Sequence, residues 1–270
     1  MYRVLNDNNV YVNVTIDDID NNLKLETPLK REIIMAMGKT HKMEYLTYLY
    51  PYLNDEKFYM RRDAAQSIFL INGKEGINRL KQREQQLDES DFETEPSEKA
   101  FLQAMIIRIE KGTDGAEEYF FSEQGNEIVK YVQVAYYEEG YLYKDDDIKL
   151  IIKILNAYVE KKIPWIIRLP KSEYMEAIFF TLQSIWYAKD STGLLQNIED
   201  NLCDQLCTVF QKISEMKIDS DIIEMIADIT MGMRKEYAIK ILKVLKGRVR
   251  GDAKKAYKRS LKFFGLEDLL

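Results

Sequence analysis

Hydrophobic residues recur at helical spacing throughout residues 40–73. One series comprises Met43, Leu46, Leu49 and Leu53, and a second comprises Met60, Ala64, Ile68 and Ile71. Intervals of three or four residues place each series on one side of a helix. Thr40 is a suitable N-cap for the first helix, and Gly73 suits the left-handed end of the second. The pattern therefore predicts two antiparallel helices joined near Asn54 and Asp55.

The same pattern occurs once more, 31 residues earlier. The matching pairs are Leu29 with Met60, Lys30 with Arg61, Ile33 and Ile34 with Ala64 and Ala65, and Met37 with Ile68. The earlier copy also has its own boundaries, with Thr27 and Pro28 at the start and Gly38 at the end. A period of this size is typical of stacked helical units rather than of a closed domain.

The repeated unit resembles the HEAT repeat, in particular the short form of the bilin-lyase-like HEAT family. The resemblance covers residues 16–87 and rests on Asp55, Met60, Arg61, Ala64, Ala65 and Ile68, with Lys30, Ala36, Met37 and Gly38 in the earlier copy. It implies an all-α fold, a right-handed α-α superhelix in which Asp55 and Arg61 tie adjacent repeats together. A chromophore-lyase activity is suggested by the repeat type alone, and no individual residue supports it.

We expect one helical-repeat domain over residues 1–270. Val10, Val12 and Val14 alternate with polar residues, so residues 1–15 are expected to be an N-terminal cap with a short strand or extended arm. The remaining segments are the clearest repeats (16–87), an acidic loop (88–95), degenerate helical repeats (96–233) and a basic C-terminal helix pair (234–270).

The bulk composition favours a globular chain in a reducing compartment. Hydrophobic residues make up 46% of the 270 positions, which is enough for a continuous core. No apolar run approaches the roughly 20 residues of a membrane span, and the N-terminus lacks the pattern of a secretory signal. With two cysteines in addition, we expect a cytoplasmic protein that does not enter a membrane.

Charge is strongly segregated along the chain. Residues 234–262 contain twelve Lys and Arg against Glu236 and Asp252, a net charge of +10. Because the whole chain carries −6 and Glu267 and Asp268 add −2, residues 1–233 carry −14. The basic end is either a solvated outer face or a contact surface for nucleic acid. The candidate contacts are Arg248, Arg250, Lys254, Lys255, Lys258 and Arg259.

One segment combines aromatic and acidic residues and is the candidate partner-binding site. It comprises Tyr136, Tyr137, Glu138, Glu139, Tyr141, Tyr143, Asp145, Asp146 and Asp147. Tyrosine anchors surrounded by carboxylates suit recognition of a protein surface rich in Arg and Lys. The alternative is a loop whose tyrosines are buried while its acids remain in water.

The sequence offers no specific catalytic or metal-binding motif. Cys203 and Cys207 lie four residues apart on one helix face, but the single histidine, His41, is distant in sequence. Two small core residues are the better interpretation of the cysteines. We therefore expect neither a metal ion nor another cofactor.

These observations favour a non-enzymatic protein-binding scaffold. In its sharper form, the hypothesis is an immunity or inhibitor protein that neutralises a basic protein such as a bacterial toxin nuclease. The alternative is a HEAT-like DNA glycosylase or another nucleic-acid-binding protein that uses the basic C-terminal end. For a glycosylase, Trp165 or Trp186 would supply the aromatic side chain, together with one of the many Asp residues.

Overall fold

The computed structural model describes residues 2–5, 11–14, 27–88, 97–135, 145–191 and 193–269. The predicted all-α class is confirmed, and a short antiparallel pair of strands precedes the helices. Strand β1 (Tyr2–Leu5) pairs with β2 (Tyr11–Val14), with Tyr2 opposite Val14. β2 lies within the predicted alternating stretch, whereas β1 was not expected.

The chain divides into two compact units, residues 1–115 and 116–270. The expectation of one continuous repeat domain therefore stays a prediction. Helix α5 (Glu98–Phe121) contains residues of both units and is interrupted at Gly112, whose φ of 68° and ψ of −162° are not helical. Glycine tolerates this positive φ because it has no Cβ.

The first unit contains the two clear repeats. Its helices are α2 (Thr27–Lys39), α3 (Leu46–Leu49), α4 (Phe58–Gln85) and the first part of α5, with the 3-10 helices η1 (Met43–Tyr45) and η2 (Tyr50–Asn54) on either side of α3. The helix predicted to start at Thr40 is thus divided into three short pieces. Pro51, at the start of η2, has no N–H to continue an α-helix.

Helices α2 and α4 pack closely through small residues. A Cβ placed on Gly38 would lie 2.7 Å from the Cα atom of Ser67, so only glycine fits there. The Ser67 hydroxyl donates a 2.8 Å hydrogen bond to the carbonyl oxygen of Ile34. Ile33, Ile34, Met37, Ala64 and Ile68, which the repeat pattern assigned to the core, are all buried.

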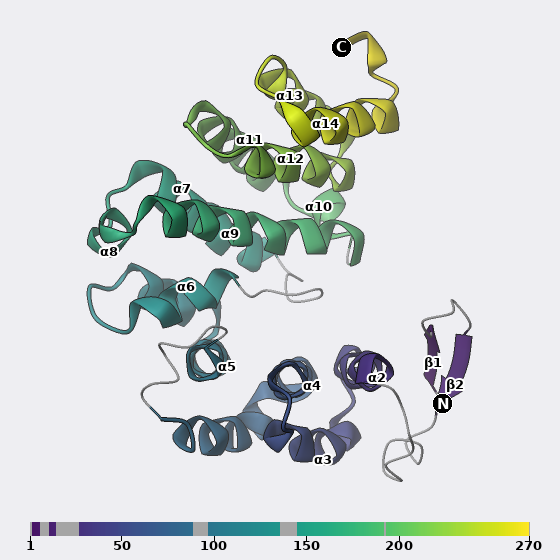
Figure 1. Ribbon diagram of the computed structural model, residues 1–270, viewed down its shortest axis with the longest axis vertical. Helices are drawn as coiled ribbons and strands as arrows, with labels where there is room; N and C mark the ends of the chain where they lie inside the picture. Colours follow the sequence, from purple (N-terminus) through teal and green to yellow (C-terminus); the bar gives the residue numbers. More distant parts are fainter. Residues whose placement is uncertain are drawn as a thin grey trace. The chain divides into compact units, whose positions relative to one another are not determined.

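Helix α4 bends sharply rather than running straight. A Cβ on Gly76 would lie 2.0 Å from the Cγ2 atom of Ile68, although eight residues of straight helix would separate the two by about 12 Å. Figure 1 shows the two parts of α4 running in different directions. The predicted helix end at Gly73 therefore corresponds to this bend, and the helix continues beyond it to Gln85.

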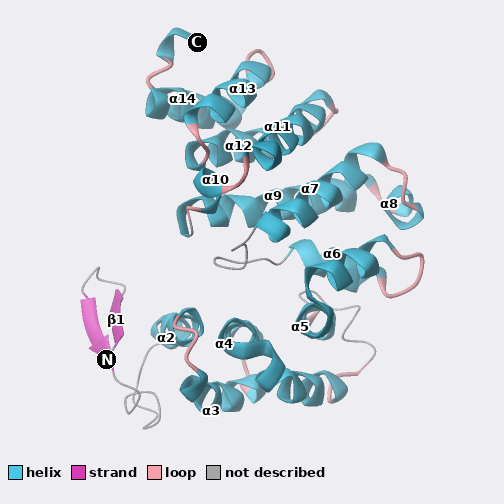
Figure 2. Cartoon of the chain, turned by 180° about the vertical axis from the view of Figure 1, so that it is seen from behind, coloured by secondary structure: helices cyan, strands magenta, loops and turns pink. Residues whose placement is uncertain are grey.

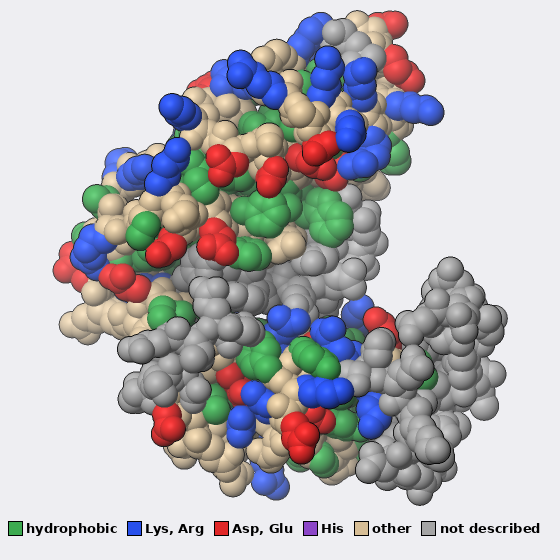
Figure 3. Space-filling model, in the orientation of Figure 1, with side chains coloured by type: hydrophobic (Ala, Val, Ile, Leu, Met, Phe, Trp, Pro, Cys, Tyr) green, Lys and Arg blue, Asp and Glu red, His purple; other side chains and the backbone are tan. Residues whose placement is uncertain are grey.

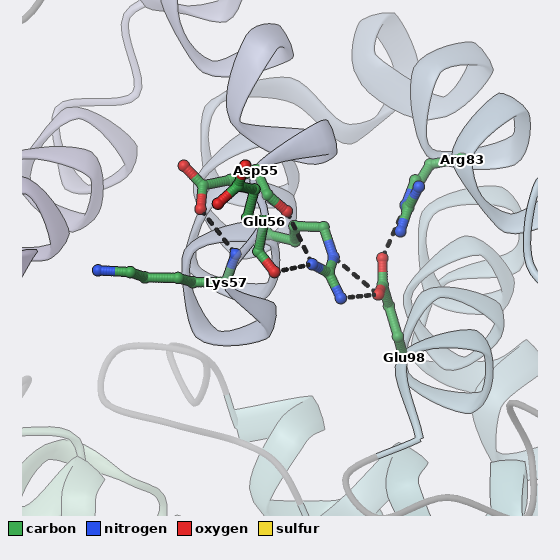
Figure 4. A network of polar contacts seen from close by, with 6 residues as sticks. Asp55, Glu56, Lys57, Arg83 and Glu98 are labelled. Carbon is green, nitrogen blue, oxygen red and sulfur yellow. Dashed lines mark hydrogen bonds and ion pairs between the residues drawn. The ribbon is translucent and has the colours of Figure 1, made fainter. Parts of the chain in front are cut away.

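Ion pairs join successive helices of the first unit. Asp63, which is fully buried on α4, accepts hydrogen bonds from Arg31 on α2. In the next link, Glu98 of α5 lies between Arg61 (2.6 Å) and Arg83 (2.8 Å), and Figure 4 shows the contact of Glu98 with Arg83. Arg61 also donates to the backbone carbonyl of Asp55 at 2.7 Å. Arg61 thus joins neighbouring helices as expected, whereas the Asp55 side chain accepts from the backbone N–H of Lys57.

The second unit is built of helices in two layers (Figure 2). One layer contains α7 (Asp145–Glu160), α11 (Asp200–Glu215) and α13 (Lys235–Leu245), and the other contains α9 (Lys171–Ser191), α12 (Ser220–Ile229) and α14 (Gly251–Phe264). The shorter elements are α6 (Glu127–Ala135), α8 (Pro164–Arg168), α10 (Leu194–Asn197), η4 (Thr230–Gly232) and η5 (Glu267–Leu269). This alternation is the arrangement that stacked helix pairs produce. The right-handed superhelix stays a prediction.

Candidate functional site

The predicted aromatic and acidic segment lies mostly outside the described residues, which omit 136–144. Asp145, Asp146 and Asp147 form the first turn of α7, where a helix N-terminus stabilises negative charge. Asp146 is exposed and lies 3.0 Å from the ammonium of Lys149, whereas Asp147 is buried. Of these three carboxylates, Asp146 is exposed and ion-paired, Asp145 is half-buried, and Asp147 is buried.

A second acidic surface lies on α9 and α12, which are neighbours in one helix layer. We call it the acidic face and define it by Glu173 and Phe179 on α9 and Asp221, Glu224, Met225 and Asp228 on α12. The four α12 residues follow the spacing i, i+3, i+4, i+7, which places them on one side of the helix. Ile222, Ile223 and Ile226 occupy the opposite side and are buried.

Carboxylates and large hydrophobic side chains lie together on this face. Glu173 and Asp221 are exposed, while Phe179, Glu224 and Met225 are half-buried. Figure 3 shows acidic and hydrophobic side chains over α9 and α12, and basic side chains over α14. The ring of Phe179 packs edge-to-face against Phe180 with centroids 5.7 Å apart, which fixes its position on the surface.

The negative charge of the acidic face is only partly neutralised. Arg259 of α14 donates to both carboxylate oxygens of Asp228, at 2.6 and 2.8 Å. Among the described residues, no cation lies within ion-pair distance of Glu173, Asp221 or Glu224. Glu173 and Asp221 therefore remain to attract a cationic group from outside, whereas Glu224 already lies in the field of Lys255 and Arg259.

The predicted basic contacts divide into two groups. Arg248 donates to the carbonyl oxygen of Ser214 at 2.6 Å, Lys255 pairs with Asp252 at 2.7 Å, and Arg259 is held by Asp228. In the part of the chain that the structure describes, Arg250, Lys254 and Lys258 are exposed and have no ion-pair partner. Nucleic-acid binding by these residues stays a prediction.

The remaining candidate residues have structural environments. Cys203 is buried beside Arg234, 3.3 Å from its Nη2, and burial raises the pKa of the Cys203 thiol. Burial also raises the pKa of Cys207 to about 12. His41 lies with Nδ1 2.7 Å from the carbonyl oxygen of Leu70. Within the described ranges, no group of three His, Cys, Asp or Glu residues is arranged to hold a metal ion.

Trp165, considered above for base recognition, belongs to the core of the second unit. Its indole N–H donates to the carbonyl oxygen of Phe120 at 3.1 Å, and its ring packs edge-to-face on Phe120 and Tyr158. Beneath it, Lys130 is buried and donates to the carbonyl oxygen of Ser122. Burial lowers the pKa of Lys130. Trp165 is therefore not positioned to stack on a bound base.

Sequence reasoning missed the acidic face, although its signal was present. The spacing of Asp221, Glu224 and Asp228 is readable in the sequence, but only packing shows that this side of α12 faces outward and that α12 lies beside α9. None of the helices in the described ranges combines the length and apolar character needed to cross a bilayer. Neither protein-family models nor curated proteins nor solved structures give a significant match to this chain.

Proposed function

We propose that this protein is a non-enzymatic binding scaffold whose acidic face recognises a basic protein. The observation that carries the proposal is a set of three carboxylates without an ion pair among the described residues, Glu173, Asp221 and Glu224. They lie on the same two helices as the hydrophobic side chains of Phe179 and Met225. Interfaces that bind proteins commonly pair hydrophobic anchors with a charged rim.

Each part of the face has a separate contribution to binding. Carboxylates speed the encounter with a cationic partner and exclude acidic ones, but they add little affinity where they stay in water. Phe179 and Met225 offer apolar area that is lost from water when a partner covers it. Methionine also adapts its shape to different contact surfaces. The face is therefore suited to a partner that presents Arg or Lys around an apolar centre.

In its sharper form, the proposal is an inhibitor or immunity protein that covers the cationic surface of a toxin such as a nuclease. The support is the net charge of −14 over residues 1–233, because a nuclease presents positive charge to its substrate. The expected partner is a small basic protein, bound in a defined stoichiometry.

Affinity purification from native cells, at low and moderate salt, tests the proposal. The wild-type chain is compared with the triple variant Glu173→Lys, Asp221→Lys, Glu224→Lys. The control variant is Glu118→Lys, Glu123→Lys, Glu267→Lys, which makes the same change of charge at exposed acids outside the acidic face. A basic protein retained by the wild type and the control but lost from the triple variant supports the proposal. Equal retention by all three forms contradicts it.

A further inference from the structure

A cavity of about 400 Å³ lies in the second unit, near its basic end. It is formed where the turn between α11 and α12 meets the turn between α13 and α14. Its walls include Lys217 and Ile218 from the first turn, and Arg248 and Arg250 from the second. The volume is within the range of small-ligand sites, which is about 300–1,000 Å³.

All the ionisable side chains that line the cavity are cationic. They are Lys217, Arg248 and Arg250, and no carboxylate contributes to the walls. Lys217 and Arg250 have no ion-pair partner among the described residues. Three positive charges around one cavity repel each other, and a bound anion would relieve that repulsion.

Arg248 is held in place and still has donors to offer. Its Nη1 donates to the carbonyl oxygen of Ser214, in the last turn of α11. This contact satisfies a carbonyl that a helix end leaves without an intrahelical partner. Nε and Nη2 have no hydrogen-bond partner in the described structure, so these two nitrogens can donate hydrogen bonds to a ligand.

Two helices begin at the cavity wall. α12 starts at Ser220 and α14 starts at Gly251, and neither has a side-chain hydrogen bond capping its N-terminus. Each of these helix ends leaves its first backbone N–H groups without a side-chain acceptor and carries partial positive charge, which Asp221 and Asp252 in the first turns partly offset. Ile218, Ile223 and Ala253 supply an apolar part of the wall.

From this arrangement we propose that the cavity binds a phosphate group carried by an organic ligand. Arginine recognises phosphate oxygens with parallel hydrogen bonds, and lysine adds a point charge. The cavity is larger than a phosphate ion, and its apolar wall accommodates the organic part. The phosphate belongs either to a small ester such as a nucleotide or to a nucleic-acid backbone. The inference is independent of the proposed protein-binding function, because it rests on other residues.

Calorimetric titration with inorganic pyrophosphate, adenosine monophosphate and a ten-nucleotide single-stranded DNA tests this site. Lys217→Ala and Arg250→Ala each remove one cation that has no intramolecular ion pair. Lys235→Ala and Lys243→Ala remove exposed cations of α13 that do not line the cavity. Circular dichroism confirms that every variant is folded.

The expected result is saturable binding that Lys217→Ala and Arg250→Ala each weaken by about tenfold, as loss of a charge-assisted hydrogen bond does. The two control variants bind like the wild type. A mononucleotide that binds as tightly as the oligonucleotide identifies a small ester. Tighter, strongly salt-dependent binding of the oligonucleotide, displaced by pyrophosphate, identifies a nucleic-acid backbone. Absence of binding by all three probes, or equal losses in cavity and control variants, overturns the proposal.

Discussion

The hydroxyl of Ser260 donates a 2.7 Å hydrogen bond to the carbonyl oxygen of Ala227, 33 residues earlier. Ser67 makes the same contact with Ile34, also across 33 residues, in the other unit of the chain. Arg31 with Asp63 and Arg259 with Asp228 are ion pairs separated by 32 and 31 residues. Polar contacts between helices of both units thus span 31 to 33 residues, close to the 31-residue period of the sequence.

The closeness of α2 and α4 predicts a specific sensitivity at Gly38. Gly38→Ala should lower the free energy of unfolding by about 1–3 kcal/mol, because the added methyl meets the Ser67 backbone and the helices must separate. Urea denaturation measures this loss. Glu32→Ala, on the exposed side of the same helix, is the control and should change stability by less than about 0.5 kcal/mol. Equal effects of both substitutions would refute the close approach.

Glu98 neutralises two arginines, so the three single substitutions should differ. Glu98→Ala leaves Arg61 and Arg83 facing each other and should cost about 2 kcal/mol or more, since its side chain is only 9% exposed. Arg83→Ala should cost less, because Arg61 still pairs with Glu98.

Thermal unfolding of Glu98→Ala, Arg83→Ala and Arg61→Ala ranks these effects. Arg61→Ala should be the more harmful of the two arginine substitutions, since Arg61 also donates to the Asp55 and Glu56 carbonyls. If Glu98→Ala lowers thermal stability less than Arg83→Ala does, Glu98 does not hold both arginines as the structure indicates.

Alkaline pH should destabilise the second unit through Cys207. Burial raises the pKa of this thiol from 9.0 to about 12, so the folded state keeps a proton that the unfolded state releases. The stabilisation is complete below pH 9 and is lost as pH rises from 9 towards 12. Because the thiol is partly exposed, its contribution should lower the free energy of unfolding by less than about 1.4 kcal/mol per pH unit.

Urea denaturation between pH 8 and pH 11 tests this contribution. The free energy of unfolding of the wild type is compared with that of Cys207→Ala at each pH. The wild type should lose stability more steeply than the variant over this range. Tyr174, whose pKa burial raises to about 12, remains in both proteins and contributes equally to their curves. Parallel curves for the two proteins would show that Cys207 contributes nothing to the pH dependence.

Much of the fold could be read from residue spacing, because buried positions on helices recur at regular intervals. Ile33, Ile34, Ala64 and Ile68 were assigned to the core, and they are buried. Local geometry was harder to predict. Pro51 divides one expected helix into short pieces. Helix α4 bends so sharply that Gly76 comes close to Ile68.

The candidate sites depended on packing that spacing does not specify. Arg259 looked like a cation available to nucleic acid, yet it pairs with Asp228, 31 residues earlier. Asp147 was grouped with the surface acids, yet it is buried in the first turn of α7. Whether a charged side chain is available depends on the neighbouring helix, and that neighbour lies one repeat away in the sequence.

The predicted aromatic and acidic segment can be tested separately from the acidic face. Glu138→Lys, Glu139→Lys, Asp145→Lys and Asp146→Lys, combined in one variant, should weaken partner binding if this segment contributes to the interface. Asp147 is left unchanged because it is buried. Binding is measured by surface plasmon resonance with the partner recovered from cells. Unchanged affinity would remove the segment from the interface.

The most direct test of the protein-binding proposal is the affinity of that partner for the acidic-face triple variant Glu173→Lys, Asp221→Lys, Glu224→Lys. We expect at least a tenfold loss of affinity, with a slower association rate, relative to the wild type. The control variant Glu118→Lys, Glu123→Lys, Glu267→Lys should bind within about twofold of the wild type, since isolated surface charges contribute little. Equal affinities of the triple variant and the control would contradict the assignment of this face.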